Sequence, residues 1–166
     1  MRERSRSRFG SSKAGWVPGR KAGYHLHTSW YILGELVRRL DGRPFEQYVR
    51  ERIFAPLGMK DTMFLPPAPL ASRIAPTEPC ERLAWPCGAN APMLRGVVHD
   101  LTARRMDGVA GHAGLFGTAD DLAKFARMLL GKGTLDGARI LSPLSVERMT
   151  SPATPVTRTL SSSLAV

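Results

Sequence analysis

Two apolar periodicities, separated by a glycine and a proline, constrain the first half of this chain more than any other feature. Residues 29–41 carry apolar side chains at intervals of three and four, which predicts an amphipathic helix ended by Gly42. Its predicted buried stripe is Trp30, Leu33, Val37 and Leu40. Pro44 suits the first turn of a second helix. The inner face predicted for that helix is Phe45, Val49, Ile53 and Tyr48. The sequence therefore predicts two consecutive helices, the second ended by Pro-Leu-Gly at 56–58.

The second half predicts another amphipathic helix. Thr118 followed by Asp121 has the form of a capping box. The buried stripe predicted behind it is Leu122, Phe125, Ala126 and Leu129. Asp120, Asp121 and the earlier Asp100 are interpreted as caps and helix-start charges, which the helix dipole favours.

The remaining segments predict short elements. Ser142 followed by Pro143 predicts a short helix up to Met149. Residues 96–100, GVVHD, are compatible with a short strand, and residues 131–141 with a glycine-rich turn leading into an extended piece. Residues 65–95 hold seven of the thirteen prolines, which predicts a long loop of the kind that often borders a site.

Charge and composition exclude several classes of protein. Residues 1–21 hold seven Lys/Arg and one Glu, which is +6 of the net charge of +10. No aromatic residues interleave with these arginines, so we expect no nucleic-acid partner. No apolar run reaches the ~18 residues of a membrane span. The chain as written also has no signal peptide, which predicts a cytoplasmic location, or a periplasmic or secreted one if the N-terminus is truncated. Cys80 and Cys87 have the spacing C-x6-C, which is not that of a zinc site.

Two longer segments carry a family resemblance. The first begins with Pro-Gly and Gly-Tyr around residues 18–24 and continues as WYILGELVRRLDGRPFEQYVRERIFAPLGMKDTMF. The second is GVVHDLTARRMDGVAGHAGLFGTADDLAKFARMLL. Together they resemble the serine β-lactamase and penicillin-binding-protein-like hydrolases, and more narrowly the class C β-lactamase-related group with its esterases and D-alanyl-D-alanine peptidases. The resemblance covers about residues 16–155.

The resemblance implies an acyl-enzyme mechanism built from three motifs. They are S-x-x-K with the nucleophile, a Tyr motif with a phenol near that Ser, and Lys/His-Thr/Ser-Gly on an edge strand. By position after Pro-Gly, Tyr24 matches the Tyr motif and is the candidate catalytic residue, although Leu26 stands where an Asn is typical. His25, His27 and His112 are the candidate substrate-binding residues at the rim.

Two of the three motifs are missing from these 166 residues. None of the five lysines has a Ser three residues before it, so S-x-x-K is absent. His112-Ala113-Gly114 imitates the third motif but leads directly into the capped helix, which matches an earlier rim segment of the family. The sequence therefore resembles an interior fragment of a serine hydrolase.

These observations predict an α+β fold, a partial β-lactamase/transpeptidase-like fold with mainly its helical part and little of the antiparallel sheet. Residues 1–17 are predicted to be a disordered basic tail, residues 18–155 the hydrolase fragment, and residues 156–166 a frayed tail. We expect no cofactor and no metal, and a small-molecule or peptide substrate with an acyl group. No feature predicts an oligomeric state. Two alternatives stay open, a non-catalytic binding remnant of the fold and a His-rich metal-binding domain.

Overall fold

The computed structural model describes residues 28–77, 79 and 93–152. Tyr24, His25 and His27, together with Cys80 and Cys87, lie outside the described residues. The chain divides into two units, His25–Thr150 and a second made of the terminal segments. All elements discussed below belong to the first unit.

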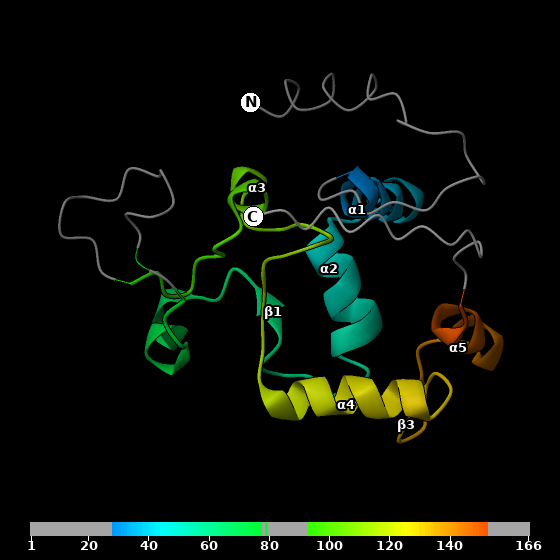
Figure 1. Ribbon diagram of the computed structural model, residues 1–166. Coiled ribbons are helices and arrows are strands. Elements are labelled where there is room, and N and C mark those ends of the chain that lie inside the picture. Colours follow the sequence, from blue (N-terminus) through cyan, green and yellow to red (C-terminus); the bar gives the residue numbers. More distant parts are fainter. Residues whose placement is uncertain (1–27, 78, 80–92, 153–166) are drawn as a thin grey trace. The chain divides into compact units, whose positions relative to one another are not determined.

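The elements follow one another along the chain as coloured in Figure 1. In order they are α1 (Thr28–Asp41), α2 (Phe45–Val49), the π-helix η1 (Arg50–Phe54), β1 (Met63–Phe64), the 3-10 helix η2 (Ala68–Arg73), α3 (Leu101–Arg105), β2 (Leu115–Phe116), α4 (Ala119–Leu130), β3 (Thr134–Leu135), β4 (Ala138–Arg139) and α5 (Pro143–Thr150). None of the helices in the described ranges has the length and apolar character that crossing a bilayer requires. The predicted α+β class is confirmed, with helices and short antiparallel pairs.

The second predicted helix is confirmed as α2 and η1, which form one continuous helix in Figure 1, called the α2–η1 helix below. The Ala55 N–H donates to the Arg50 carbonyl at 2.8 Å, a spacing of five residues that marks the wider π turn. The turn that follows this helix ends at Gly58, whose φ of 63° suits a residue without a β-carbon. The inner face of the helix packs as predicted, because Val49 is buried and Phe45, Tyr48 and Ile53 are partly buried against the same cluster.

The hydrophobic core lies where α4 crosses the end of the α2–η1 helix (Figure 1). Its buried residues are Val49, Phe54, Leu57, Met59, Met128 and Leu135. Met128 is fully buried. The core is thus formed by the α2–η1 helix, the Pro-Leu-Gly turn after it, α4 and β3.

Two antiparallel strand pairs flank this core. β1 pairs with β2, with Met63 opposite Phe116 and Phe64 opposite Leu115. β3 pairs with β4 through a turn at Asp136 and Gly137, whose φ values of 45° and 86° are those of a type I′ hairpin. The predicted glycine-rich turn and extended piece therefore form a tight hairpin.

The strand expected at residues 96–100 is wrong. The Val98 carbonyl accepts from the Arg104 guanidinium at 3.0 and 3.1 Å, and Asp100 begins α3. The segment therefore directs its hydrogen bonds to a helix that follows it, and not to a neighbouring strand. In the part of the predicted loop at 65–95 that the structure describes, residues 68–73 form the 3-10 helix η2.

The first predicted helix is confirmed as α1, but its predicted buried stripe is wrong. Trp30, Leu33 and Leu40 are 45%, 52% and 80% exposed, whereas Tyr31 is only 7% exposed. A β-carbon added to Gly34 would lie 3.7 Å from the Gly111 backbone. The face that packs is therefore the one with the small residue, because a neighbouring loop can approach there. Periodicity identifies the apolar face of a helix but not the face that finds a partner in this chain.

The third predicted helix is confirmed as α4, and the Thr118 side chain accepts from the Asp121 N–H as a cap should. Its predicted stripe is only half right. Phe125 and Leu129 pack against the core, but Leu122 is 66% exposed and Ala126 is also exposed. Met128 and the carboxylate of Asp121 are buried instead.

Asp121 is more than a helix-start charge. Its Oδ2 accepts from the Asp61 N–H at 2.8 Å and the Thr62 hydroxyl at 3.0 Å. Its Oδ1 accepts from Lys124 Nζ at 2.8 Å, and Lys124 also donates to the Gly58 carbonyl. Burial raises the pKa of Asp121, but Lys124, the Asp61 N–H and Thr62 together hold that pKa below its usual value. The buried carboxylate therefore joins α4 to the turn before β1.

Replacing Asp121 by Ala should destabilise the unit by about 2–4 kcal/mol, because the buried donors lose their acceptor. The matched control is Asp120→Ala, since Asp120 is the exposed neighbour in the same first turn. That change should cost at most ~1 kcal/mol. Urea denaturation followed by circular dichroism measures both, and equal effects would show that the contacts of Asp121 are unimportant.

The contribution of Asp121 should also depend on pH. Because its folded pKa is depressed, its stabilisation is present above the unfolded value of about 3.9 and is lost as the pH falls through the folded pKa. The difference in unfolding free energy between the wild-type chain and Asp121→Ala should therefore shrink below pH ~4. A difference that stays constant down to pH ~2 would contradict this.

Candidate active-site rim

An aspartate and a histidine twelve residues apart in the sequence meet beside α1. His112 Nε2 lies 3.0 Å from Asp100 Oδ1, and the two side chains are 11% and 29% exposed. His112 Nδ1 is also buried. The pair lies between the start of α3 and the loop before β2.

Asp100 has a second partner set at the start of α3. Its Oδ1 accepts from the N–H groups of Thr102 at 2.9 Å and Ala103 at 2.7 Å, so Asp100 is the N-cap, as predicted. Burial raises the pKa of Asp100, but the Ala103 N–H, the His112 ring and the Thr102 N–H hold that pKa below its usual value. The carboxylate is therefore ionised near neutral pH.

Tyr31 of α1 completes the cluster. Its ring centroid lies 5.1 Å from that of His112, with the planes tilted by 55°. Burial and the nearby Asp100 charge raise the pKa of the Tyr31 phenol, with Arg105 acting in the opposite direction. Tyr31 is therefore a neutral phenol that packs on the imidazole.

Gly111 allows this contact. A β-carbon at Gly111 would lie 2.5 Å from the Trp30 carbonyl oxygen, which is closer than any real contact. The loop therefore reaches α1 only because residue 111 has no side chain. Gly114, with φ 111°, approaches the Gly108 carbonyl in the same way and closes the loop. The glycines of the GHAG sequence thus place His112 between α1 and α3.

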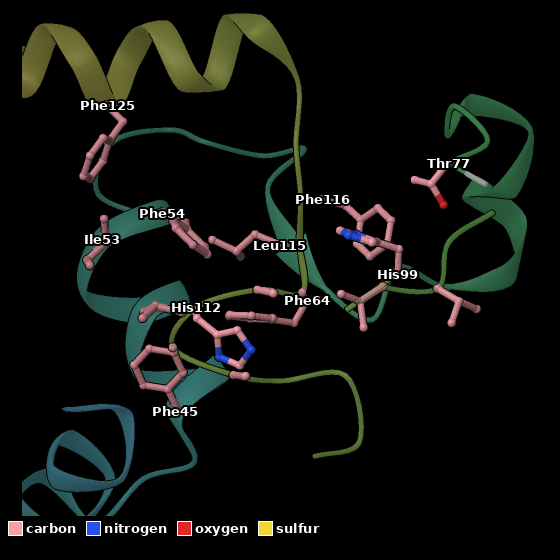
Figure 2. A pocket seen from close by; sticks show the side chains of 17 residues that line it. Phe45, Ile53, Phe54, Phe64, Thr77, His99, His112, Leu115, Phe116 and Phe125 are labelled. Carbon is pink, nitrogen blue, oxygen red and sulfur yellow. The ribbon is translucent and has the colours of Figure 1, made fainter. Parts of the chain in front are cut away.

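A cavity of about 560 Å³ lies next to this loop. It is lined mainly by aromatic and aliphatic side chains of the α2–η1 helix, β1, β2 and α4, among them Phe45, Phe54, Phe64, Leu115, Phe116 and Phe125. Figure 2 shows His112 beside Phe45, and His99 beside Phe116 on the side toward Thr77. The site is thus an apolar cavity whose lining includes two imidazoles.

The structure describes only one of the four predicted site residues. His112 lies at the cavity, while the structure does not describe Tyr24, His25 and His27. Within the described ranges, no three His, Cys, Asp or Glu side chains gather as a metal site would require. Sequence reasoning missed Asp100 as a partner of His112, because its role as a cap already explained it. The only signal was that His99-Asp100 precedes GHAG within one segment of the resemblance.

Comparison with known proteins identifies the family to which this chain belongs. The family model described as Beta-lactamase matches residues 2–162, and the chain belongs to that family. The predicted resemblance is thereby confirmed.

Two relatives of known name illustrate the similarity. The N-acetylmuramyl-L-alanine amidase of Bacillus subtilis is 30% identical over 142 residues, which are 78% of this chain and 31% of the relative. An Escherichia coli K12 protein assigned by name to the D-alanyl-D-alanine carboxypeptidases is 30% identical over 144 residues, 81% of this chain and 32% of the relative. The chain thus spans about a third of the length of these curated relatives.

Solved structures agree on the fold. A penicillin-binding protein homolog from Caulobacter crescentus superposes with a TM-score of 0.56 at 28% identity, over 80% of this chain and 37% of that one. The simvastatin synthase LovD of Aspergillus terreus superposes with a TM-score of 0.53 at 29% identity, over 83% of this chain and 30% of that one.

The facing glycines give a test of the packing of the loop on α1. Gly111→Ala should displace the loop and cost about 1–3 kcal/mol, because its β-carbon meets a backbone carbonyl. Gly34→Ala is the control on the opposite surface, since its β-carbon would make ordinary contacts at 3.7 and 3.8 Å. In a helix this change should be neutral or stabilising by up to ~1 kcal/mol. Urea denaturation measures the free energies, and nuclear Overhauser contacts between Tyr31 and His112 report the loop position. Equal tolerance of both changes would contradict the close approach.

Proposed function

We propose that this chain forms part of the site of a serine hydrolase that acts through an acyl-enzyme, and that the 166 residues by themselves do not carry out that reaction. Membership of the beta-lactamase family supports the first statement. The absence of a Ser three residues before any lysine supports the second, and it is the observation that carries the proposal. A Ser hydroxyl needs a neighbouring base to become nucleophilic, and here that Ser-Lys pair is missing.

Tyr24 and the histidines have distinct roles in this proposal. Tyr24 supplies the phenol that handles the proton of the nucleophilic Ser, which nearby ammonium groups make possible by favouring the phenolate. His25, His27 and His112 belong to the substrate-binding rim. The support for Tyr24 is its place after Pro18-Gly19 and before α1, and the support for His112 is its position at the cavity.

The substrate proposed is a molecule with an acyl group, namely a β-lactam, a D-alanyl peptide or an ester. The named relatives support this class, since they include an amidase and a protein assigned to the carboxypeptidases. The apolar lining of the cavity beside His112 is compatible with the hydrocarbon part of such a group.

The first test is covalent labelling of the 166-residue chain. Incubation with a fluorescent penicillin or a fluorophosphonate should give no adduct by intact mass spectrometry, because there is no activated Ser. A penicillin-binding protein labelled in parallel shows that the reagents are active. A stoichiometric adduct on any Ser of this chain would overturn the proposal that it is inactive alone.

The second test concerns Tyr24 in a polypeptide that carries this sequence together with an S-x-x-K segment. Tyr24→Phe keeps the ring and removes the proton-transfer group, so kcat for a p-nitrophenyl ester should fall by ~10²–10⁴. Tyr48→Phe, on the core side of α2, is the matched control and should leave kcat unchanged. Near-wild-type turnover by Tyr24→Phe on every accepted substrate would exclude the catalytic role.

The missing Ser-Lys pair also favours a second candidate, a binding domain that keeps the fold without the chemistry. The same polypeptide separates the two. If neither it nor the isolated chain forms an adduct or hydrolyses an ester or a cephalosporin, the binding domain is the better description.

A further inference from the structure

We propose that Asp100 is a positioning residue for His112, and that the pair fixes the loop of residues 110–114 as one wall of the cavity. The cap of α3 and the wall of the site would then share a single carboxylate. The importance of this wall for a substrate rests on the proposed function, whereas the positioning of the ring does not.

The first step is that capping alone does not require an aspartate. Ser, Thr or Asn would accept from the Thr102 and Ala103 N–H groups equally well. Asp100 uses the same Oδ1 for these two donors and for His112 Nε2, with distances of 2.7–3.0 Å. A hydroxyl would still cap the helix, but it can donate to the imidazole as well as accept from it, so it would not hold Nε2 as the protonated nitrogen. The carboxylate, which only accepts, therefore serves His112.

The second step is the state of the imidazole. Because the Asp100 carboxylate is ionised near neutral pH, it can only accept, so His112 Nε2 must carry the proton of the shared hydrogen bond. When it carries a single proton, the ring is thus held as the Nε2–H tautomer. Nε2 contacts Asp100, Nδ1 is buried, and the residue lines the cavity.

The third step is that the ring is held on its other sides as well. The Tyr31 ring packs against the imidazole, with centroids 5.1 Å apart and planes tilted by 55°, and Gly111 brings the preceding backbone onto α1. The residues on either side of His112, from Ala110 to Gly114, all line the cavity. Fixing the imidazole therefore fixes a continuous stretch of backbone against which a substrate would lie.

Two substitutions separate the clamp from the cap. Asp100→Ser keeps an N-cap, but its hydroxyl can donate to His112 as well as accept from it and does not fix the tautomer, whereas Asp100→Asn keeps both the cap and an acceptor of the same length. Asp107→Asn, an exposed position at φ 59° that tolerates Asn, is the charge-matched control. Circular dichroism and protection of the α3 amides would show that each variant is folded.

The readout is nitrogen NMR of the 166-residue chain with labelled histidine, at a pH where the rings are neutral. His112→Gln identifies the signals among the four histidines. The wild-type chain, Asp100→Asn and Asp107→Asn should show His112 as the Nε2–H tautomer with contacts to Tyr31. Asp100→Ser should show a mixture of tautomers and lose those contacts. A His112 ring that is unchanged in Asp100→Ser would overturn the inference and leave Asp100 as a cap only.

A kinetic measurement then tests the wall. In the polypeptide with the S-x-x-K segment, Asp100→Ser should raise KM for a p-nitrophenyl ester several-fold. It should leave labelling by a small fluorophosphonate unchanged, and Asp100→Asn should restore KM. If the ring moves in Asp100→Ser but KM does not change, the pair does not shape a substrate wall. If labelling itself fails in the parent polypeptide, the proposed function fails, and the NMR result still decides the positioning of His112.

Discussion

The buried carboxylate of Asp121 is the contact on which the arrangement of the unit depends. It accepts from the Asp61 N–H and the Thr62 hydroxyl, directly before β1, and the backbone N–H of Asp121 donates to the Thr118 hydroxyl, after β2. One residue therefore ties together the chain segments at the same end of the two paired strands. Because a two-stranded ribbon is marginal by itself, this tie helps to keep the register of Phe64 opposite Leu115.

That register decides where the loop before β2 lies. With Leu115 held opposite Phe64, the preceding Gly-His-Ala-Gly segment extends toward α1, where Gly111 and Gly34 allow the two backbones to approach. His112 then lies between Tyr31 and Asp100. The rim thus brings α1 together with the start of α3 and the loop before β2, which come much later in the chain.

This sequence contains only some of the features that the family resemblance implies. The sequence contains the candidate phenol, the candidate rim histidines and the apolar cavity wall, while the Ser-Lys pair is absent from it. The apolar face of α1, with Trp30, Leu33 and Leu40, is exposed in the described unit. The part of the family sequence that these 166 residues cover therefore does not include that pair.

What the sequence by itself determined is local. Four features depend on residues within a few positions of one another, and all could be predicted or nearly so. They are the Thr118 cap, the Ser142 cap of α5, the Asp136-Gly137 hairpin and the end of α1 after Asp41. The family resemblance could also be identified from the sequence, because it rests on contiguous motifs.

Tertiary structure alone decided which face of α1 is buried and that Asp100 reaches His112. It also decided that the buried face of α4 carries Asp121 and Met128 in place of Leu122 and Ala126. The physical reason is that an amphipathic pattern states only which side chains are apolar, whereas burial requires a partner surface. A buried carboxylate likewise requires donors, and here they come from residues up to sixty positions away.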